Sequence, residues 1–480
     1  IRGLSLPMKD SCNKQHSSHI ASKVDLSPDS TEGAPRITKK DQLHRFMSPD
    51  SQSALLPEDV EGINTGREKS IAKCHEMKAI TAGLLIDGNG GEPTKHAVVL
   101  VEDGKITKVG EASKVAVPDQ AEVFDATERT VMPGMIDCHC HPSLTTMSIE
   151  KILFTHKTVE IFRTAEILKR TLHAGFTTIR ETGCLNDVGF RQAVEMGLVE
   201  GPRLVLAGAL AQTGGHFDEY YPRDIELPTT GVEIADGVPA VQAAARRILR
   251  KGFDFIKVCS SGGFASPADE PEYTEWTLEE LKAIVYEASA RGKAVAAHAV
   301  GTRGIKNAIR AGVWTVEHGS ILDDEAIQMF LKTGTYLVSS LFATEEMVLR
   351  GKEMGLSDVS IAKCQKYGLV DFESFRKAAA AGVKIALGTD AIVDGMHGKN
   401  ARELELMVAN GFTTMQAILA ATKIASEACR VDGKVGTIEP GKQADLLVVD
   451  GNPLEDITIL QDQSRLRLVM KDGKTHLNRL

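Results

Sequence analysis

The middle of the chain alternates short apolar runs with longer segments of helical length, such as Thr277–Arg291 and Phe372–Ala381. The first of these segments has two glutamates in its first turn. Strands that alternate with helices are typical of parallel βαβ units. The predicted strands cover residues 131–139, 176–181, 203–209, 253–261, 294–300, 315–320, 335–341 and 384–391. Eight such repeats predict an α/β fold of the (β/α)8 (TIM) barrel type over residues 132–433.

A doubly wound open sheet is the alternative for the same alternation. That fold often carries a GxGxxG turn after its first strand, where a dinucleotide binds. No GxGxxG follows the first predicted strand of this chain. The closed barrel is therefore favoured.

The two ends of the chain have another pattern, in which short alternating strands are separated by tight turns. Asp-Gly pairs occur at 87–88, 103–104 and 472–473, and this pair favours hairpin turns. Neither end could bury a sheet face alone. Residues 46–131, with an N-terminal lead-in, and 434–480 therefore predict one small, discontinuous β-sandwich domain.

Residues 1–45 are polar and show no periodicity, which indicates a disordered tail or a propeptide remnant. The chain begins with Ile1, as expected of a processed or trimmed product. The eight cysteines are scattered and form no CxxC pair. Free thiols are therefore expected in place of a disulfide framework or a structural zinc knuckle.

Composition narrows the class of partner. No apolar run approaches the roughly 18 residues that a membrane helix requires, and a formal net charge of -9 argues against binding a nucleic acid, whose partners carry a basic face. The sequence thus predicts neither a membrane nor a nucleic-acid partner. A small-molecule substrate is expected.

The first predicted strand ends in a His-Cys-His motif. His139 and His141 are two residues apart on an extended segment, so their side chains project to the same side. Imidazole is a common zinc ligand, and barrel enzymes place their chemistry at the carboxyl ends of the strands. The pair predicts a metal site, with two solvent-facing loop histidines as the alternative.

Lys257 lies inside the apolar fourth strand, 253–261. Burying an ammonium without a partner is costly, and barrel strands are covered on both faces. Two explanations fit the lysine. It either pairs with a carboxylate such as Glu181 or Asp390, or it is carboxylated by CO2 to a carbamate that bridges two cations, and the neighbouring ligand candidates favour the carbamate.

Three further strands end in candidate ligands. His298 closes the fifth strand, His318 the sixth and Asp390 the eighth. A single buried histidine is most often structural, and an aspartate at a strand end can simply cap a turn. Their recurrence at the same rim favours metal ligation, with Asp390 also transferring protons.

Taken in chain order, these residues resemble the pattern of the amidohydrolase superfamily, over about residues 76–480. The resemblance implies two divalent cations per chain, and mixed histidine, carboxylate and carbamate ligands suit Zn²⁺ best. Such cations lower the pKa of water and polarise an amide carbonyl. The resemblance further implies that His139, His141 and Asp390 hold one ion, that His298 and His318 hold the other, and that N6-carboxylated Lys257 bridges the two ions.

Within the superfamily, the loop Thr213–His216, the turn Ser260–Gly263 and the segment His397–Asn400 resemble a branch that contains prolidase-like dipeptidases and imidazolonepropionase-related enzymes. The whole chain is similar to the fungal ochratoxinase group. This likeness implies hydrolysis of an amide between an aromatic acyl group and a C-terminal amino acid such as phenylalanine. The alternative activities are those of a cyclic-amide hydrolase and of a prolidase-like dipeptidase. The complete set of ligands argues against a barrel protein that has lost its activity.

A substrate of this kind has a free carboxylate, which needs a partner near the rim. His216 and Tyr221 on the loop after the third strand, and Arg180 at the end of the second, are the candidates. Each has a structural alternative, which is loop packing for the first two and an ion pair for Arg180. The resemblance also implies a homo-oligomer, in relatives often an octamer, and a secreted protein, with the cytoplasm as the alternative.

Overall fold

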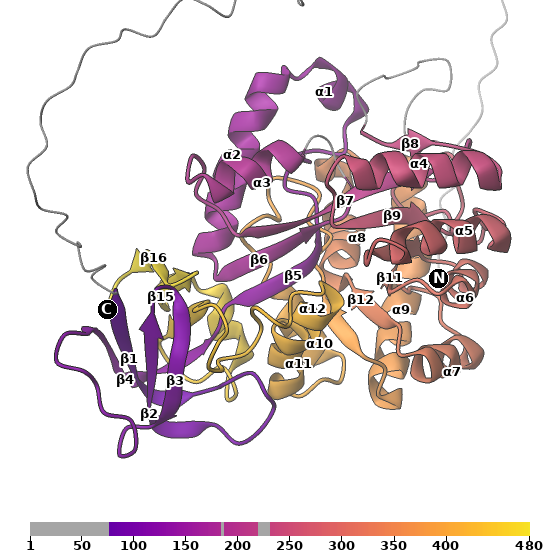
Figure 1. The fold of residues 1–480 in the computed structure, drawn as a ribbon. Helices are drawn as coiled ribbons and strands as arrows, with labels where there is room; N and C mark the ends of the chain where they lie inside the picture. The colour runs from indigo at the N-terminus through magenta and orange to yellow at the C-terminus, as the bar shows by residue number, and fades with distance from the viewer. Residues whose placement is uncertain (1–75, 184–186, 219–230) are drawn as a thin grey trace, which may run out of the picture. The chain divides into compact units, whose positions relative to one another are not determined.

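A computed structural model describes residues 76–183, 187–218 and 231–480 of the chain. Within them, the eight predicted barrel strands are all present and parallel, with neighbours hydrogen-bonded in the order β13-β12-β11-β10-β9-β7-β6-β5. The α/β barrel is therefore confirmed (Figure 1). Its strands are β5 (Met135–Cys140), β6 (Phe176–Glu181), β7 (Arg203–Ala211), β9 (Phe255–Cys259), β10 (Ala294–Ala299), β11 (Thr315–His318), β12 (Tyr336–Ser339) and β13 (Ile385–Leu387).

The ring closes between β5 and the segment that follows β13. Cys140 forms a parallel bridge with Ala391, and the backbone N–H of His141 donates to the Ala391 carbonyl at 3.0 Å. The Asp390 N–H likewise donates to the carbonyl of His139 at 2.6 Å. The first and last predicted ligand segments are thereby held side by side.

Helices cover the barrel, and their ends follow the sequence signals. Thr277 and Glu280 form a capping box at the start of α5 (Leu278–Ser289), as the glutamates there suggest. The predicted helix 372–381 is only the last part of a longer helix. The helices on the barrel are α1 (Ile149–Phe154), α2 (Lys157–His173), α3 (Asp187–Glu195), α4 (Val238–Arg250), α5, α6 (Thr302–Ala311), α7 (Asp324–Thr333), α8 (Leu341–Met354), α9 (Asp358–Ala381), α10 (Arg402–Ala409), α11 (Thr414–Ala420) and α12 (Lys423–Ala428).

The chain ends build one mixed sheet of seven strands in the order β16-β15-β14-β4-β1-β2-β3. Figure 1 shows the indigo N-terminal strands beside the yellow C-terminal ones. The separate β domain drawn from both ends is thus confirmed. Its strands are β1 (Met77–Leu85), β2 (Thr94–Glu102), β3 (Lys105–Glu111), β4 (Glu122–Pro133), β14 (Leu446–Val449), β15 (Leu466–Lys471) and β16 (Lys474–Asn478).

The predicted first barrel strand, 131–139, belongs to two sheets. Residues 131–133 end β4 and pair with β14, whereas β5 begins at Met135. The residue between them is Gly134, where a Cβ atom would lie 2.2 Å from the Thr177 hydroxyl oxygen. Glycine is required here because β6 approaches so closely, and the chain passes from one sheet to the other across this one residue.

Polar contacts tie the sheet to the barrel. The guanidinium of Arg203, at the start of β7, donates to Asp445 at 2.8 Å, and the ammonium of Lys471 in β15 donates to the Gly201 carbonyl at 2.6 Å.

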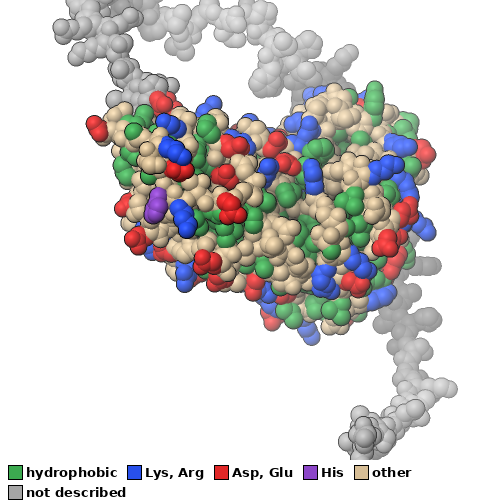
Figure 2. Space-filling model, turned by 90° about the horizontal axis from the view of Figure 1, so that it is seen from below, with side chains coloured by type: hydrophobic (Ala, Val, Ile, Leu, Met, Phe, Trp, Pro, Cys, Tyr) green, Lys and Arg blue, Asp and Glu red, His purple; other side chains and the backbone are tan. Residues whose placement is uncertain are grey.

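Acidic and basic side chains are mixed over the face that Figure 2 shows. Among the described residues, none of the helices has the length and apolar character needed to cross a membrane.

Candidate active site

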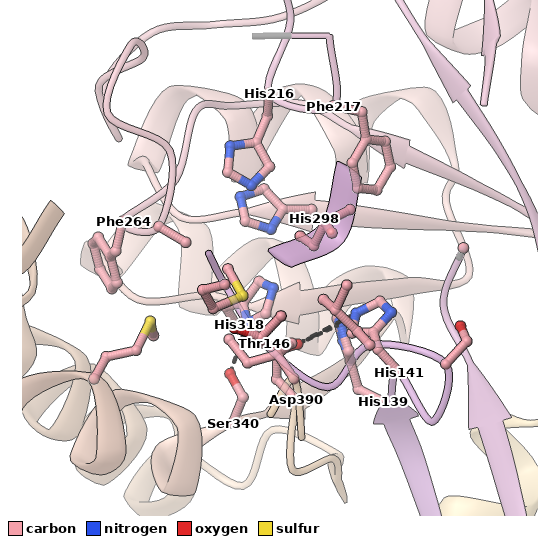
Figure 3. A pocket seen from close by; sticks show the side chains of 18 of the residues that line it. His139, His141, Thr146, His216, Phe217, Phe264, His298, His318, Ser340 and Asp390 are labelled. Atoms are coloured by element: carbon pink, nitrogen blue, oxygen red, sulfur yellow. Dashed lines mark hydrogen bonds and ion pairs between the residues drawn. The ribbon is translucent and has the colours of Figure 1, made fainter. Parts of the chain in front are cut away.

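Three predicted ligands meet at the rim where the barrel closes. His139 and His141 come from β5 and Asp390 follows β13, and Figure 3 shows the three side chains turned toward one another. The Asp390 Oδ1 atom lies 3.4 Å from His139 Nε2 and 3.3 Å from His141 Nε2, and the ligand atoms of the three residues lie within 4.8 Å. Such a group can hold one metal ion.

The other two histidines continue the same cluster. The ring centroid of His318, at the end of β11, lies 4.8 Å from that of His139, and the ring of His298, in β10, lies 4.6 Å from that of His318. All four histidines and Asp390 line one pocket. The structure therefore brings the predicted histidines and the aspartate together.

Hydrogen bonds at the back of the pocket fix which ring nitrogen of each histidine faces inward. His139 donates through Nδ1 to Glu317 at 2.8 Å, and the Nδ1 atom of His141 lies 3.3 Å from Glu181. Nε2 of both rings then faces Asp390, and Nε2 of His141 also lies 3.2 Å from the Thr182 hydroxyl. Outer partners of this kind orient metal ligands.

His318 and His298 are held in a similar way. Ser340, at the start of α8, pairs with His318 through Nδ1 at 2.6 Å, and His298 directs Nε2 toward the Gly262 carbonyl at 3.4 Å. His318 therefore presents Nε2, and His298 presents Nδ1. None of these hydrogen-bond partners of the histidines could be identified from the sequence pattern.

Lys257 also lines the pocket, and it is almost fully buried in β9. The two carboxylates expected as its partners are engaged elsewhere. Glu181 accepts from the Gly183 N–H as well as facing His141, and Asp390 faces the two β5 histidines. Among the described residues, no ion pair includes Lys257, so the ion-pair explanation is not supported.

Burial and the charges of neighbouring groups determine the charge states in the pocket. Burial lowers the pKa of His139, His298 and His318 well below the usual value, and nearby Lys257 adds to this effect. Neutral imidazoles are what a metal ion needs. Burial alone would raise the pKa of Asp390, but His139 and His141 together with Lys257 lower it to about 2.

Two of the predicted ligands have an unusual backbone. His318 has φ 71° and Asp390 has φ 48°, a left-handed conformation that residues with a Cβ atom adopt at some cost. Strain of this kind collects at functional sites when the surrounding structure maintains it. Here it occurs at two residues whose side chains line the pocket.

Of the two predicted carboxylate contacts that the structure describes, His216 and Arg180, only His216 lies in the pocket. Its Nδ1–H donates to Asp269 at 2.5 Å, and its ring stacks on that of His298. Burial alone would lower the pKa of His216, but the Asp269 carboxylate reverses this and raises it above the ordinary value. Tyr221 lies outside the described residues.

Arg180 does not reach the pocket. It is buried, and its guanidinium donates two hydrogen bonds to Glu317, at 2.7 and 2.8 Å. A further bond goes to the Cys138 carbonyl at 2.5 Å. The structural ion pair, which the sequence left open as the alternative, is therefore what the structure shows.

Cys138 and Cys140 also turn away from the pocket. The Sγ atom of Cys138 lies 3.5 Å from that of Cys429, whereas Cys140 approaches the Arg180 carbonyl. Cys138 is a free thiol, as expected, and neither cysteine lines the pocket. Thiol ligation of a metal here is not supported.

The outer walls of the pocket are largely apolar. Phe217 and Phe264 lie on opposite sides of the histidine cluster in Figure 3, and Met147 and Met347 also contribute. Lys151 of α1 adds a positive charge to the lining. Lys151 could not be recognised from the sequence, because it does not lie at the end of a barrel strand.

Comparisons with known proteins agree with this geometry. The profile of the amidohydrolase family matches residues 130–476. Ochratoxinase from Aspergillus niger is 34% identical over 432 residues, which cover 84% of this chain and 88% of that protein. Its crystal structure matches with a TM-score of 0.77 at 32% identity, over 84% of this chain and 96% of that one.

A second solved structure is that of a Xaa-Pro dipeptidase with methionine bound in its active site. It is 34% identical, with a TM-score of 0.77, and the match covers 83% of this chain and 99% of that one. The sequence match, the fold and the candidate ligands at the strand ends thus support the same family. The chain belongs to the amidohydrolase family and is a hydrolase of amide bonds.

Proposed function

We propose that this chain is a dinuclear metal-dependent amidohydrolase that cleaves the amide between an acyl group, preferably aromatic, and an amino acid with a free carboxylate. One observation carries the proposal. Four histidines, Asp390 and Lys257, which has no ion-pair partner among the described residues, line a single pocket with apolar walls.

The residues fit two divalent ions, with Zn²⁺ the leading candidate. His139, His141 and Asp390 would hold one, and His298 and His318 the other. An ammonium at Lys257 would repel both ions by several kcal/mol at about 4 Å, even at an effective dielectric of about 20. We therefore propose that Lys257 is carboxylated, because a carbamate offers an anionic oxygen to each ion.

Bound cations of this kind activate water and polarise the amide carbonyl. The chain itself supplies proton transfer. Asp390 is ionised at neutral pH, so it can accept the proton of the attacking water and pass it to the leaving nitrogen. Its carboxylate lies beside both β5 histidines, where that water would be positioned.

Recognition of the substrate is assigned to the outer pocket. Phe217 and Phe264 offer apolar walls for an aromatic group, and His216 offers a donor for the substrate carboxylate. The relatives support this substrate class, since one is an ochratoxinase and the other a Xaa-Pro dipeptidase with an amino acid bound in its active site. A prolidase-like dipeptidase activity is the second candidate for the same reason.

The test combines metal analysis with a substrate panel. N-acyl-phenylalanines, Xaa-Pro dipeptides and cyclic amides are compared, the first two with the carboxylate free and amidated. We expect close to two metal ions per chain and a kcat/KM at least about tenfold higher on the free carboxylates. A metal ratio near one in fully active protein contradicts the dinuclear site, and equal rates on free and amidated substrates contradict carboxylate recognition.

Lys257 has its own test. Lys257→Met keeps the bulk of the side chain but cannot form a carbamate, so metal and activity should be lost together. Added formate or acetate should partly restore both by occupying the bridge. A bare amine at Lys257 in active, metal-loaded protein would contradict the carbamate.

The resemblance to fungal enzymes also supports two further proposals, a homo-oligomer such as an octamer and secretion from the cell. Light scattering on purified protein tests the first. Comparison of protein in culture medium and in cells tests the second, with cytoplasmic retention as the contrary result.

A further inference from the structure

A buried lysine of α9 ties together the loop that follows β9. The ammonium of Lys363 donates to the carbonyls of Gly263, Ser266 and Asp269, at 3.2, 2.5 and 2.5 Å. A side chain that satisfies three carbonyls of one loop fixes the path of that loop. Lys363 does not line the pocket, so it can act there only through the loop that it holds.

The loop holds His216 in turn. The carboxylate of Asp269 accepts from His216 Nδ1–H at 2.5 Å and from the Gly263 N–H at 3.1 Å. Its other oxygen lies 3.5 Å from the Lys363 ammonium. All three side chains are buried or nearly so, and a buried network of this kind is rigid when its groups are satisfied.

Three other contacts fix the plane of the His216 ring. Its backbone N–H donates to Glu275 at 2.7 Å, and its ring stacks on that of His298 with centroids 4.5 Å apart and an angle of 13°. Figure 3 shows the two rings next to each other. On the remaining side the ring is so close to Gly263 that a Cβ atom there would lie 2.6 Å from it. The ring therefore has little freedom to turn.

With Nδ1 donating to Asp269, Nε2 is the nitrogen that His216 offers to the pocket. We propose that Asp269 and Lys363 are positioning residues, which hold His216 so that Nε2 meets the carboxylate of the substrate. This inference rests on the proposed function, since it concerns the same pocket. Neither residue lines the pocket, so Asp269 acts through His216, and Lys363 acts through the loop that carries Asp269.

The kinetic test uses Asp269→Ala, Asp269→Asn and Lys363→Met. We expect Asp269→Ala and Lys363→Met to raise KM for free-carboxylate substrates by about 10- to 100-fold, with kcat within about threefold and the metal content unchanged. KM for the amidated substrates should not change. Asp269→Asn keeps an acceptor for Nδ1–H and should recover part of the loss.

Lys377→Met is the matched control, because Lys377 lies on the same helix but forms only an exposed pair with Glu373. It should behave as wild type. An equal loss of kcat on free and amidated substrates in Asp269→Ala would overturn the inference, since that result indicates a general structural role. If Lys363→Met does not fold, the two Asp269 variants decide.

A second readout does not depend on activity. In protein labelled with ¹⁵N-histidine, the Nδ1–H resonance of His216 is identified by its loss in His216→Gln, and it should also be lost or shifted in Asp269→Ala and Lys363→Met. An unchanged resonance in Asp269→Ala overturns the inference. A changed resonance in a protein that hydrolyses no carboxylate-bearing amide supports the positioning of His216 and contradicts the proposed function.

Discussion

The seven-stranded sheet and the rim of the barrel both bury side chains completely, but with opposite chemistry. In the core of the sheet, the fully buried side chains are apolar, such as Leu446 and Met470 in neighbouring strands, and the buried Lys78 and Lys471 each bond to a backbone carbonyl. At the rim they include Lys257 and Glu317. Because burying a charge costs far more than burying a methyl group, the sheet can be explained by stability and the rim requires a function.

The same contrast is found in the backbone. Asp103 and Asp472 in the sheet have positive φ, but each precedes a glycine in a hairpin turn, where such a conformation is ordinary. His318 and Asp390 have positive φ at the ends of buried strands, with their side chains directed into the pocket. One conformation thus serves a turn in the sheet and directs a ligand at the rim.

The largest effect is expected from Asp390→Asn. The amide keeps the size of the side chain but removes both the charged ligand and the proton acceptor, so kcat should fall by about 10³-fold or more. The melting temperature should change little. Activity within tenfold of wild type would assign proton transfer to another residue.

The sheet should respond in the opposite sense. Leu446 is fully buried between β4 and β15, so Leu446→Ala should lower the free energy of unfolding by about 3 kcal/mol. At temperatures where the variant is folded, kcat should equal that of wild type. Denaturant unfolding and an amide-hydrolysis assay measure the two effects, and a large loss of kcat would show that the sheet and the rim are coupled.

A pH experiment tests the cost of a buried charge behind the rim. Burial raises the pKa of Asp371 to about 6, although hydroxyls of Thr344 and Ser320 bond to it. A raised pKa means that the folded protein holds the proton more tightly, so this contribution to stability is complete below about pH 4 and is lost as pH rises to about 6.

Asp371→Asn removes this titration. The free energy of unfolding of wild type should therefore fall relative to the variant by up to about 3 kcal/mol between pH 4 and pH 7. Denaturant unfolding of both proteins across this range measures the difference. A difference that stays constant with pH would contradict the raised pKa.

The smallest effect is expected from Ser340→Ala, which removes the partner of His318 Nδ1. Affinity for the more weakly held metal ion should fall about tenfold, as measured by competition with a chelator. Ser339→Ala is the control, because the hydroxyl of Ser339 bonds to Glu403 and not to a histidine. Equal effects of the two variants would contradict the orienting role.

The strands could be predicted because barrel strands are buried on both faces and therefore appear as apolar runs. The candidate ligands were visible for a related reason, since His298, His318 and Asp390 are polar residues where such runs end. The boundary near Gly134 was wrong in the prediction of strand 131–139. Apolar residues continue on both sides of that glycine, so the hydrophobic pattern does not change where the chain leaves one sheet for the other.

Contacts between distant segments could not be predicted. Glu317 precedes His318 in the sequence, yet its partners are His139 and Arg180 on strands across the barrel. From the sequence alone, Arg180 could equally have bound the carboxylate of a substrate or a carboxylate of the protein. The position of Glu317 decides between the two. Lys363 gave no signal either, because a lysine in a long helix is ordinary unless its ammonium is known to be buried.

The position of β4 in the middle of the seven-stranded sheet has a consequence for folding during synthesis. Val131 in β4 pairs with Val448 in β14, so almost the whole barrel leaves the ribosome before this edge of β4 acquires its neighbour. Pairing between such distant segments is slow, and an unpaired apolar strand edge favours aggregation. A chain cut before Leu446 would keep every predicted metal ligand and still expose that edge permanently.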